Sequence, residues 1–212
     1  FYVAAMGIAK AGGGFIPTST QFRAAEVEYR LRDSGAVAAV TTAGLVDAVD
    51  EARSGAPTLA NVIVVADAER AAPKGALDFW RLVEGGDKDF DCADTASDDV
   101  AFIAYTSGTT GDPKGVVHEH RYPISYDALI RHWHDYRDHD VCACPAELGW
   151  LLPVASTCLY AMRMGITITL YHPLDGRFDP QAWFRLIQKY AITNFVGTPT
   201  IYRMMTAHAG MA

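Results

Sequence analysis

Residues 105–115 read Tyr105-Thr106-Ser107-Gly108-Thr109-Thr110-Gly111-Asp112-Pro113-Lys114-Gly115, directly after an apolar segment at 100–105 that is typical of a buried strand. The glycines permit positive φ angles and let the backbone approach an anion closely. Hydroxyl and backbone N–H groups donate hydrogen bonds to phosphate oxygens, and a lysine adds a mobile positive charge. A bare pair of glycines would indicate an ordinary turn, but this joint pattern predicts a loop that binds polyphosphate.

The loop differs from the common nucleotide-binding motifs. The Walker A pattern G-x-x-x-x-G-K-[ST] needs a glycine before its lysine and Ser or Thr after it, whereas Pro113 and Gly115 flank Lys114. The pattern G-x-G-x-x-G, found in kinases and dinucleotide-binding proteins, is also absent. A P-loop kinase or GTPase is therefore a weak alternative.

On both sides of the loop, apolar strands alternate with helical segments. Upstream, the pattern predicts strands at 37–42 and 62–66 and helices at 1–11, 24–34 and 45–53. Downstream, it predicts strands at 140–144, 166–171 and 193–196 and helices at 125–134, 151–164, 180–190 and 199–208. This alternation implies parallel sheets covered on both faces. The predicted fold class is α/β, in two subdomains with mainly parallel sheets flanked by helices.

An acidic segment at 87–99 separates the two sets of elements and is typical of a solvated linker. We therefore expect a first α/β subdomain at 1–97 that ends in this linker. The second subdomain, at 98–212, would contain the phosphate loop.

The composition is that of a globular protein, with 212 residues of which 50% are hydrophobic and 20% charged. Lys and Arg number 18 and Asp and Glu 25, so the formal net charge is 18 − 25 = −7. Because no run of Lys and Arg offers a basic footprint, nucleic acid is not expected as a partner.

The cysteines do not form a disulfide framework or a zinc-type ladder. We interpret Cys92, Cys142, Cys144 and Cys158 as reduced core thiols, with a metal or redox pair at Cys142 and Cys144 as the alternative. Reduced thiols favour a cytoplasmic setting. The apolar opening at 1–11 is shorter than the ~20 residues of a membrane span and lacks a basic start. No membrane span is therefore expected.

Both ends of the sequence suggest a piece of a longer protein. Phe1 begins a helical segment without a capping residue, and no element follows the helix expected at 199–208.

The loop at 105–115 closely resembles the signature loop of the AMP-forming adenylate superfamily, which includes acyl-CoA synthetases, luciferases and peptide-synthetase adenylation domains. Further stretches resemble the family upstream, at 7–12 with Pro17, at 28–31 and at 33–35. Downstream, the segments 115–118, 149–150 and 197–204 are most similar to the acetyl- and medium-chain acyl-CoA synthetases. The resemblance covers nearly the whole chain and implies part of the N-terminal domain of such an enzyme.

The resemblance implies a reaction in two steps. A carboxylate attacks the α-phosphorus of Mg-ATP to give an acyl-adenylate and pyrophosphate, and the thiol of coenzyme A then displaces AMP. The implied substrates and cofactors are ATP, Mg²⁺, coenzyme A and a carboxylic acid with a short, medium-chain or aromatic acyl group, as in fatty acid metabolism. By direct match, the residues implied to bind the ATP phosphates are Thr106, Ser107, Gly108, Thr109, Thr110, Gly111 and Lys114.

Several family motifs have no counterpart in this sequence. These are the Tyr-Gly-x-Thr-Glu segment, the ribose-binding Asp, and the C-terminal domain with its hinge and catalytic lysine. The catalytic residues are therefore unknown, and we predict that these 212 residues alone do not form acyl-adenylate.

The residues of the acyl pocket are less defined. His118 could contact the substrate or lie satisfied on a strand beside the loop, and Trp150 could line the pocket or fill the core. Thr198 and Pro199 follow a predicted strand, where open α/β sheets place their ligands. The histidines at 118–134 lack the spacing of a metal site, so no metal ligand is predicted.

Two alternatives remain open at this point. The acceptor of the acyl group could be a carrier-protein thiol in place of coenzyme A. A protein of another class, a non-catalytic nucleotide-binding module on the same scaffold, would also contain this loop. The oligomeric state is not predicted.

Overall fold

The computed structural model describes residues 1–107, 111–173 and 176–208. The described residues form two compact units. Phe1, Val3–Asp94 and Ile103–Val117 form the first unit, and Tyr2, Thr95–Phe102 and the residues from His118 onward form the second. The division of the chain into 1–97 and 98–212 stays a prediction.

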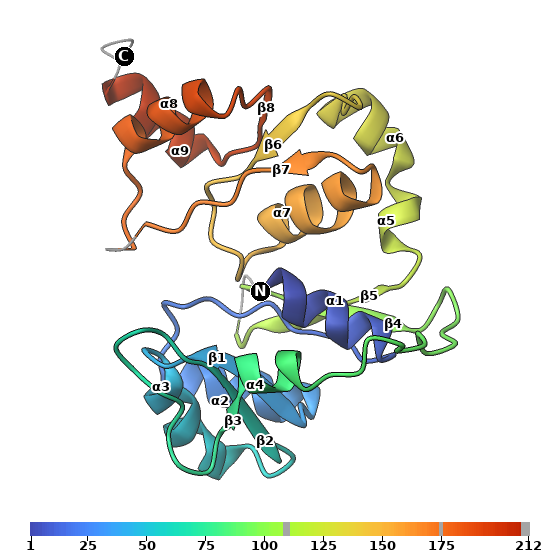
Figure 1. Cartoon of the computed structure of the whole chain (residues 1–212), viewed down its shortest axis with the longest axis vertical. Coiled ribbons are helices and arrows are strands. Elements are labelled where there is room, and N and C mark those ends of the chain that lie inside the picture. The colour runs from blue at the N-terminus through green and yellow to red at the C-terminus, as the bar shows by residue number, and fades with distance from the viewer. Residues whose placement is uncertain (108–110, 174–175, 209–212) are drawn as a thin grey trace. The chain divides into compact units, whose positions relative to one another are not determined.

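The first unit contains a parallel sheet of strands β1, β2 and β3 in that order (Figure 1). Its elements are α1 (Tyr2–Lys10), α2 (Ala24–Ser34), β1 (Ala38–Thr42), α3 (Val46–Ala52), the 3₁₀ segment η1 (Arg53–Gly55), β2 (Asn61–Val65), β3 (Leu77–Asp78) and α4 (Phe79–Glu84).

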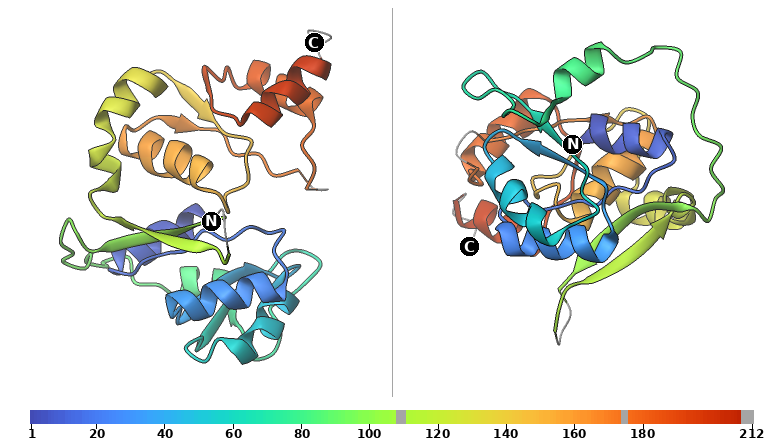
Figure 2. Two further views of the ribbon diagram at one scale, coloured as in Figure 1. Left: turned by 180° about the vertical axis from the view of Figure 1, so that it is seen from behind. Right: turned by 90° about the horizontal axis from the view of Figure 1, so that it is seen from below.

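Helices α2 and α3 cover one face of this sheet. Val62 and Val64 are buried alternately along β2 and pack in one cluster with Leu31 of α2 and Val49 of α3. Helix α4 contacts β2 and β3 and lies on the other side of the sheet from α2 in the right-hand view of Figure 2. The sheet is therefore covered by helices on both faces, as expected for parallel strands.

Strands β4 (Val100–Thr106) and β5 (Lys114–Glu119) form a two-stranded hairpin on either side of the phosphate loop. Phe102 and Ala104 are buried on one face of β4, and Ile103 and Tyr105 point to the other face. The loop therefore begins and ends on paired strands.

The second unit contains a parallel sheet in the order β7-β6-β8. Its elements are α5 (Tyr122–Ser125), α6 (Asp127–Leu129), the π-helical segment η2 (Ile130–His134), β6 (Val141–Ala143), α7 (Leu151–Pro153), the π-helical segment η3 (Val154–Ala161), β7 (Thr167–Ile168), α8 (Pro180–Lys189), β8 (Asn194–Phe195) and α9 (Pro199–His208).

Neighbouring residues of β6 pack into two different hydrophobic cores. Cys142 packs with Ile130 and Tyr160, on the side of η2 and η3, whereas Ala143 packs with Trp183 of α8 and Ile201 of α9. Figure 1 shows α7 and the helices α8 and α9 on opposite sides of these strands. The prediction of an α/β fold with mainly parallel sheets flanked by helices is confirmed.

Some local predictions were wrong. The helix expected at 125–134 is divided into α5, α6 and η2 and begins at Tyr122, because Pro123 favours the first turn of a helix. Strand β3 and helix α4 were not predicted, since two strand residues carry no periodicity. Cys92 is exposed in the acidic segment and is not a core thiol, whereas Cys142 and Cys158 are buried.

Within the described residues, no helix combines the length and apolar character that crossing a membrane requires.

Candidate functional site

The residues that flank the phosphate loop are exposed on fixed strand ends. Thr106 is the last residue of β4, Ser107 follows it, and Lys114 is the first residue of β5; all three are exposed. Gly111 adopts a φ of +105°, which a side chain would oppose. The predicted ligands Gly108, Thr109 and Thr110 lie outside the described residues. Two hydroxyl donors thus precede residues 108–110, and a lysine follows them.

Gly115 lets the two strands come together behind the loop. A Cβ atom at this position would lie 2.9 Å from Cγ2 of Ile103 and 3.3 Å from Cζ of Tyr105. No ordinary Cβ contact is that short, so the glycine of the Lys114-Gly115 pair is required by packing.

Helix α2 holds both strands by tyrosine hydrogen bonds. The hydroxyl of Tyr105, next to Thr106, donates to Oδ2 of Asp33 at 2.6 Å. The hydroxyl of Tyr29 donates to the backbone oxygen of Pro113 at 2.9 Å. These residues lie in stretches that resemble the family, but the sequence assigns them no role, because the hydrogen-bond partners are 72 and 84 residues apart.

His118, predicted for the acyl pocket, lies on β5 in an aromatic setting. Its ring stacks on Phe102 at 4.3 Å between centroids and meets the edge of Tyr122 at 4.5 Å. Burial lowers the pKa of His118, so its neutral form is favoured. The Nε2 atoms of His118 and His120 are both buried, and neither has a hydrogen-bond partner within the described residues. A neutral imidazole in this setting can serve as a weakly polar wall.

The other predicted pocket residues lie at the beginnings of helices. Trp150 directly precedes α7 and is 50% exposed. Thr198 precedes α9, and its Oγ1 accepts a long hydrogen bond of 3.5 Å from the amide of Ile201. Pro199 is the first residue of α9, as expected for a residue without an amide donor.

A hollow of about 450 Å³ lies beside the carboxyl end of β8. The residues that line it are Trp133, His134, Thr193, Asn194, Phe195, Val196, Gly197, Pro199 and Tyr202. It contains the predicted Pro199, but His118 and Trp150 are not among its lining residues. Trp133 and Tyr202 were not identified from the sequence, because an exposed aromatic residue has no distinctive local pattern.

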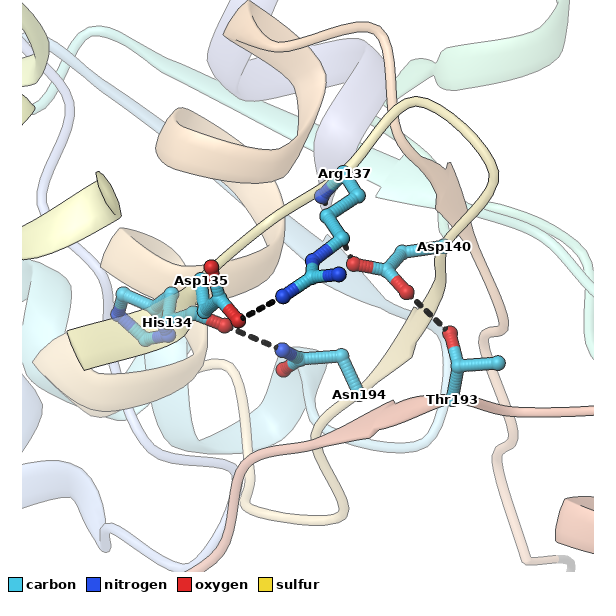
Figure 3. Close-up of polar contacts among 6 residues, drawn as sticks. All are labelled: His134, Asp135, Arg137, Asp140, Thr193 and Asn194. Atoms are coloured by element: carbon cyan, nitrogen blue, oxygen red, sulfur yellow. Dashed lines mark hydrogen bonds and ion pairs between the residues drawn. The ribbon is translucent and has the colours of Figure 1, made fainter. Parts of the chain in front are cut away.

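A polar network supports one wall of this hollow (Figure 3). Thr193 donates to Asp140 at 2.7 Å, and this bond together with the backbone amide of Arg137 lowers the pKa of Asp140. Asn194 donates to the backbone oxygen of His134 at 2.6 Å. Beside them, Arg137 pairs with Asp135 at 2.8 Å. The start of β8 is therefore tied to the turn before β6.

Across the residues that the structure describes, no cluster of three or more His, Cys, Asp or Glu side chains could hold a metal ion. Cys142 and Cys144 therefore have no metal-binding partners among them. Burial raises the pKa of the Cys144 thiol to about 11, which keeps it protonated at neutral pH.

This α/β fold places Thr106 and Lys114 at the ends of two paired strands, on either side of the Gly- and hydroxyl-rich sequence at 107–113. The chain belongs to the AMP-binding enzyme family, which matches residues 1–212.

The relatives agree with this membership. The chain is 32% identical over 206 residues to the mitochondrial acyl-coenzyme A synthetase ACSM1 of Mus musculus, covering 97% of this chain and 35% of that protein. It is 33% identical over 214 residues to the uncharacterized acyl-CoA ligase YtcI of Bacillus subtilis, covering 99% and 38%.

Solved structures share the fold. A Brucella canis acyl-CoA synthetase superposes with a TM-score of 0.87 at 23% identity, over 98% of this chain and 36% of that one. The anthranilate CoA ligase AuaEII, in complex with anthranoyl-AMP, gives 0.84 at 22% identity, over 94% and 38%. This chain thus spans between about a third and two fifths of the length of these proteins.

Proposed function

We propose that this chain is the phosphate-binding part of a longer enzyme that activates a carboxylic acid with ATP and transfers the acyl group to coenzyme A. The observation that carries the proposal is the loop itself. Thr106, Ser107 and Lys114 are exposed at the ends of two paired strands in a member of the AMP-binding enzyme family. Two similar proteins of known name are acyl-coenzyme A synthetases from mouse and from human mitochondria.

In the first step, a carboxylate oxygen forms a bond to the α-phosphorus of ATP, and the bond from that phosphorus to the bridging oxygen of pyrophosphate breaks. Negative charge then accumulates on the leaving pyrophosphate. The hydroxyls of Thr106 and Ser107, the backbone around Gly111 and the ammonium of Lys114 would stabilise this charge. Because Thr106 and Lys114 belong to paired strands, their backbone would need little reorganisation as the charge develops.

In the second step, the thiol sulfur of coenzyme A attacks the acyl carbon and AMP leaves with the electron pair of the broken bond. Mg²⁺ supplies charge neutralisation to the triphosphate and is commonly bound by substrate phosphates with one or two carboxylates. Such binding would not require a cluster of three protein ligands, which the described residues do not contain, and we assign the ion no ligand in this chain.

For the carboxylic acid, we propose a short, medium-chain or aromatic acyl group. His118 in its neutral form, Trp150, Thr198 and Pro199 remain the proposed contacts. The hollow beside β8 holds Pro199 and has walls of Trp133 and Tyr202, which suit an apolar group. A cytoplasmic setting and a place in fatty acid metabolism are part of this proposal.

The test is to incubate the full reading frame with ATP, Mg²⁺ and one acid, and to look for the acyl-adenylate by mass spectrometry. We expect the adenylate to accumulate without a thiol and to disappear when coenzyme A is added, with an acyl-CoA product. Consumption only by a phosphopantetheine-bearing carrier protein would change the proposed acceptor. Nucleotide binding without any adenylate would support a non-catalytic module and contradict the proposal.

A further inference from the structure

Two hydrogen bonds join one helix to both strands that flank the phosphate loop. We propose that Tyr29, Asp33 and Tyr105 form a clamp that positions this loop for the transfer of charge to pyrophosphate. The inference rests on the proposed function, but it concerns residues to which the sequence resemblance gave no role. All of these residues belong to the first unit.

The upstream half of the clamp is a charged hydrogen bond. The hydroxyl of Tyr105 donates to Oδ2 of Asp33 at 2.6 Å, within the range of short bonds to a carboxylate. Burial, and then Asp33, raises the pKa of Tyr105 well above its ordinary value, so the hydroxyl keeps its proton for this bond. Because Tyr105 directly precedes Thr106, the bond fixes the strand end at the first loop ligand.

The downstream half holds the backbone before Lys114. The hydroxyl of Tyr29 donates to the backbone oxygen of Pro113 at 2.9 Å. Proline fixes its own φ near −65°, so anchoring its carbonyl leaves the next peptide unit little freedom. The rings of Tyr29 and Tyr105 meet edge to face at 6.3 Å, which couples the two halves.

Helix α2 is a rigid support for the clamp. Arg30, between the clamp residues, is only 7% exposed, and its Nη1 donates to the backbone oxygen of Glu26 at 2.7 Å. Its guanidinium lies 3.9 Å from the ring centroid of Phe22 and 5.3 Å from that of Tyr105. Such stacking suits a planar guanidinium and restrains the Tyr105 ring.

The clamp should affect the rate of the chemical step and not the binding of the acid. Loop donors that are held in place stabilise the leaving pyrophosphate without reorganisation, so their loosening reduces the rate of the chemical step. The clamp residues do not contact the carboxylate in this account, so its KM is unaffected. Loosening the clamp should therefore lower kcat of ATP–pyrophosphate exchange and leave the KM for the acid unchanged.

The experiment uses the full reading frame with Tyr29→Phe, Tyr105→Phe and Asp33→Asn. Each variant is expected to lose roughly tenfold in kcat of exchange, which corresponds to one net hydrogen bond, with the KM for the acid within about twofold. Amide hydrogen exchange of peptides that cover the loop should become several-fold faster in each variant. Tyr105→Phe removes the bond, and Asp33→Asn weakens the same bond by removing the negative charge of its acceptor, so their double variant should lose no more than Tyr105→Phe alone.

Two control variants remove polar groups that make none of the hydrogen bonds of the clamp. Arg32→Gln breaks an exposed ion pair with Glu28 on the same helix, and Tyr190→Phe removes an exposed hydroxyl after α8. Both should keep the wild-type kcat of ATP–pyrophosphate exchange and the wild-type rate of amide hydrogen exchange in the loop.

The outcomes separate the clamp from the proposed reaction, because loop protection is measured without any turnover. Amide hydrogen exchange could be faster in the clamp variants while neither the variants nor the wild type catalyse ATP–pyrophosphate exchange. That result would support the clamp and contradict the proposed reaction. Wild-type loop protection and kcat in all three variants would overturn the clamp. A loss of kcat that Arg32→Gln shares, in step with a lower melting temperature, would also overturn it.

Discussion

Gly115 is a single residue on which the spacing of the loop strands depends. Its missing side chain leaves room for Ile103 and Tyr105 of the neighbouring strand. A methyl group placed there would come too close to side-chain atoms of β4, so the Ile103 side chain or one of the strands has to shift. This packing requirement explains why a glycine follows Lys114 independently of any contact with phosphate.

We predict that Gly115→Ala lowers the free energy of unfolding by roughly 1–3 kcal/mol, the usual cost of overpacking, in a urea titration. Adding Ile103→Ala removes the Cγ2 atom that lies 2.9 Å from the new methyl group. The double variant should therefore lose less than the sum of the two single variants. Strict additivity would show that the two positions do not meet.

Thr193 acts through its hydroxyl in the network of Figure 3. It donates to Asp140 at 2.7 Å and accepts from the amide of Val141 at 3.0 Å. We predict that Thr193→Val lowers the free energy of unfolding by roughly 1–2 kcal/mol, because two hydrogen bonds lose a partner at a partly exposed site. Thr193→Ser should recover most of this loss. A loss in Thr193→Ser as large as that in Thr193→Val would contradict an effect that depends on the hydroxyl.

At the scale of elements, helix α2 shows how local signals set a boundary. It begins at Ala24, where the carboxylate of Glu26 accepts a hydrogen bond of 2.9 Å from the backbone amide of Arg23. It ends at Gly35, which adopts a φ of +66°. A left-handed glycine is a common helix stop, and the sequence carries it in plain form. The helix expected at 24–34 coincides with α2 for that reason.

We predict that Gly35→Ala lowers the free energy of unfolding by roughly 1 kcal/mol, because alanine resists the left-handed conformation. The matched control is Gly7→Ala within α1, where a Cβ atom meets nothing within 4 Å. That variant should be neutral or gain up to about 1 kcal/mol from helix propensity. Chemical denaturation of both variants checks the opposite signs.

Aromatic packing around η2 makes the second unit sensitive to pH. His134 is 9% exposed, stacks on Tyr136 at 4.8 Å and meets the edge of Tyr160 at 5.8 Å. Burial lowers its pKa, as it does that of His118. Below the ordinary pKa of about 6.5, the unfolded state therefore binds protons that the folded state does not.

Stability should accordingly fall as the pH decreases from 7.5 to 5.5, by at most about 1.4 kcal/mol per pH unit for each histidine. His134→Phe should reduce this slope, while His132→Gln, at an exposed position nearby, should leave it unchanged. Denaturation curves at several pH values check the prediction. A slope in His134→Phe that equals the wild-type slope would contradict it.

The loop and most elements could be predicted from the sequence because their signals are local. Glycines, hydroxyls and Lys114 stand in one short segment after an apolar strand. The clamp could not be predicted, since Asp33 and Tyr105 are 72 residues apart and meet only in the folded unit. The hollow beside β8 was anticipated only at Pro199, because its other walls come from η2 and from exposed aromatic residues.

At the scale of the whole molecule, the chain is a member of the AMP-binding enzyme family that spans about 35% of the mouse ACSM1 protein. We propose that Thr106, Ser107 and Lys114 supply phosphate-binding groups near two strand ends, with helix α2 as their support. Because the chain spans about 35% of this relative, we expect acyl-adenylate formation to require more of the protein than these 212 residues.

ATP–pyrophosphate exchange measures directly whether the loop at 105–115 supports the activation of a carboxylate by ATP. The full reading frame is assayed with acetate, butyrate, octanoate and benzoate, beside Lys114→Ala and the control Lys88→Ala in the exposed acidic segment. We predict exchange that depends on one class of acid, falls roughly 10- to 100-fold in Lys114→Ala and is unchanged in Lys88→Ala. Exchange with none of the acids, or equal exchange in Lys114→Ala, would contradict the account.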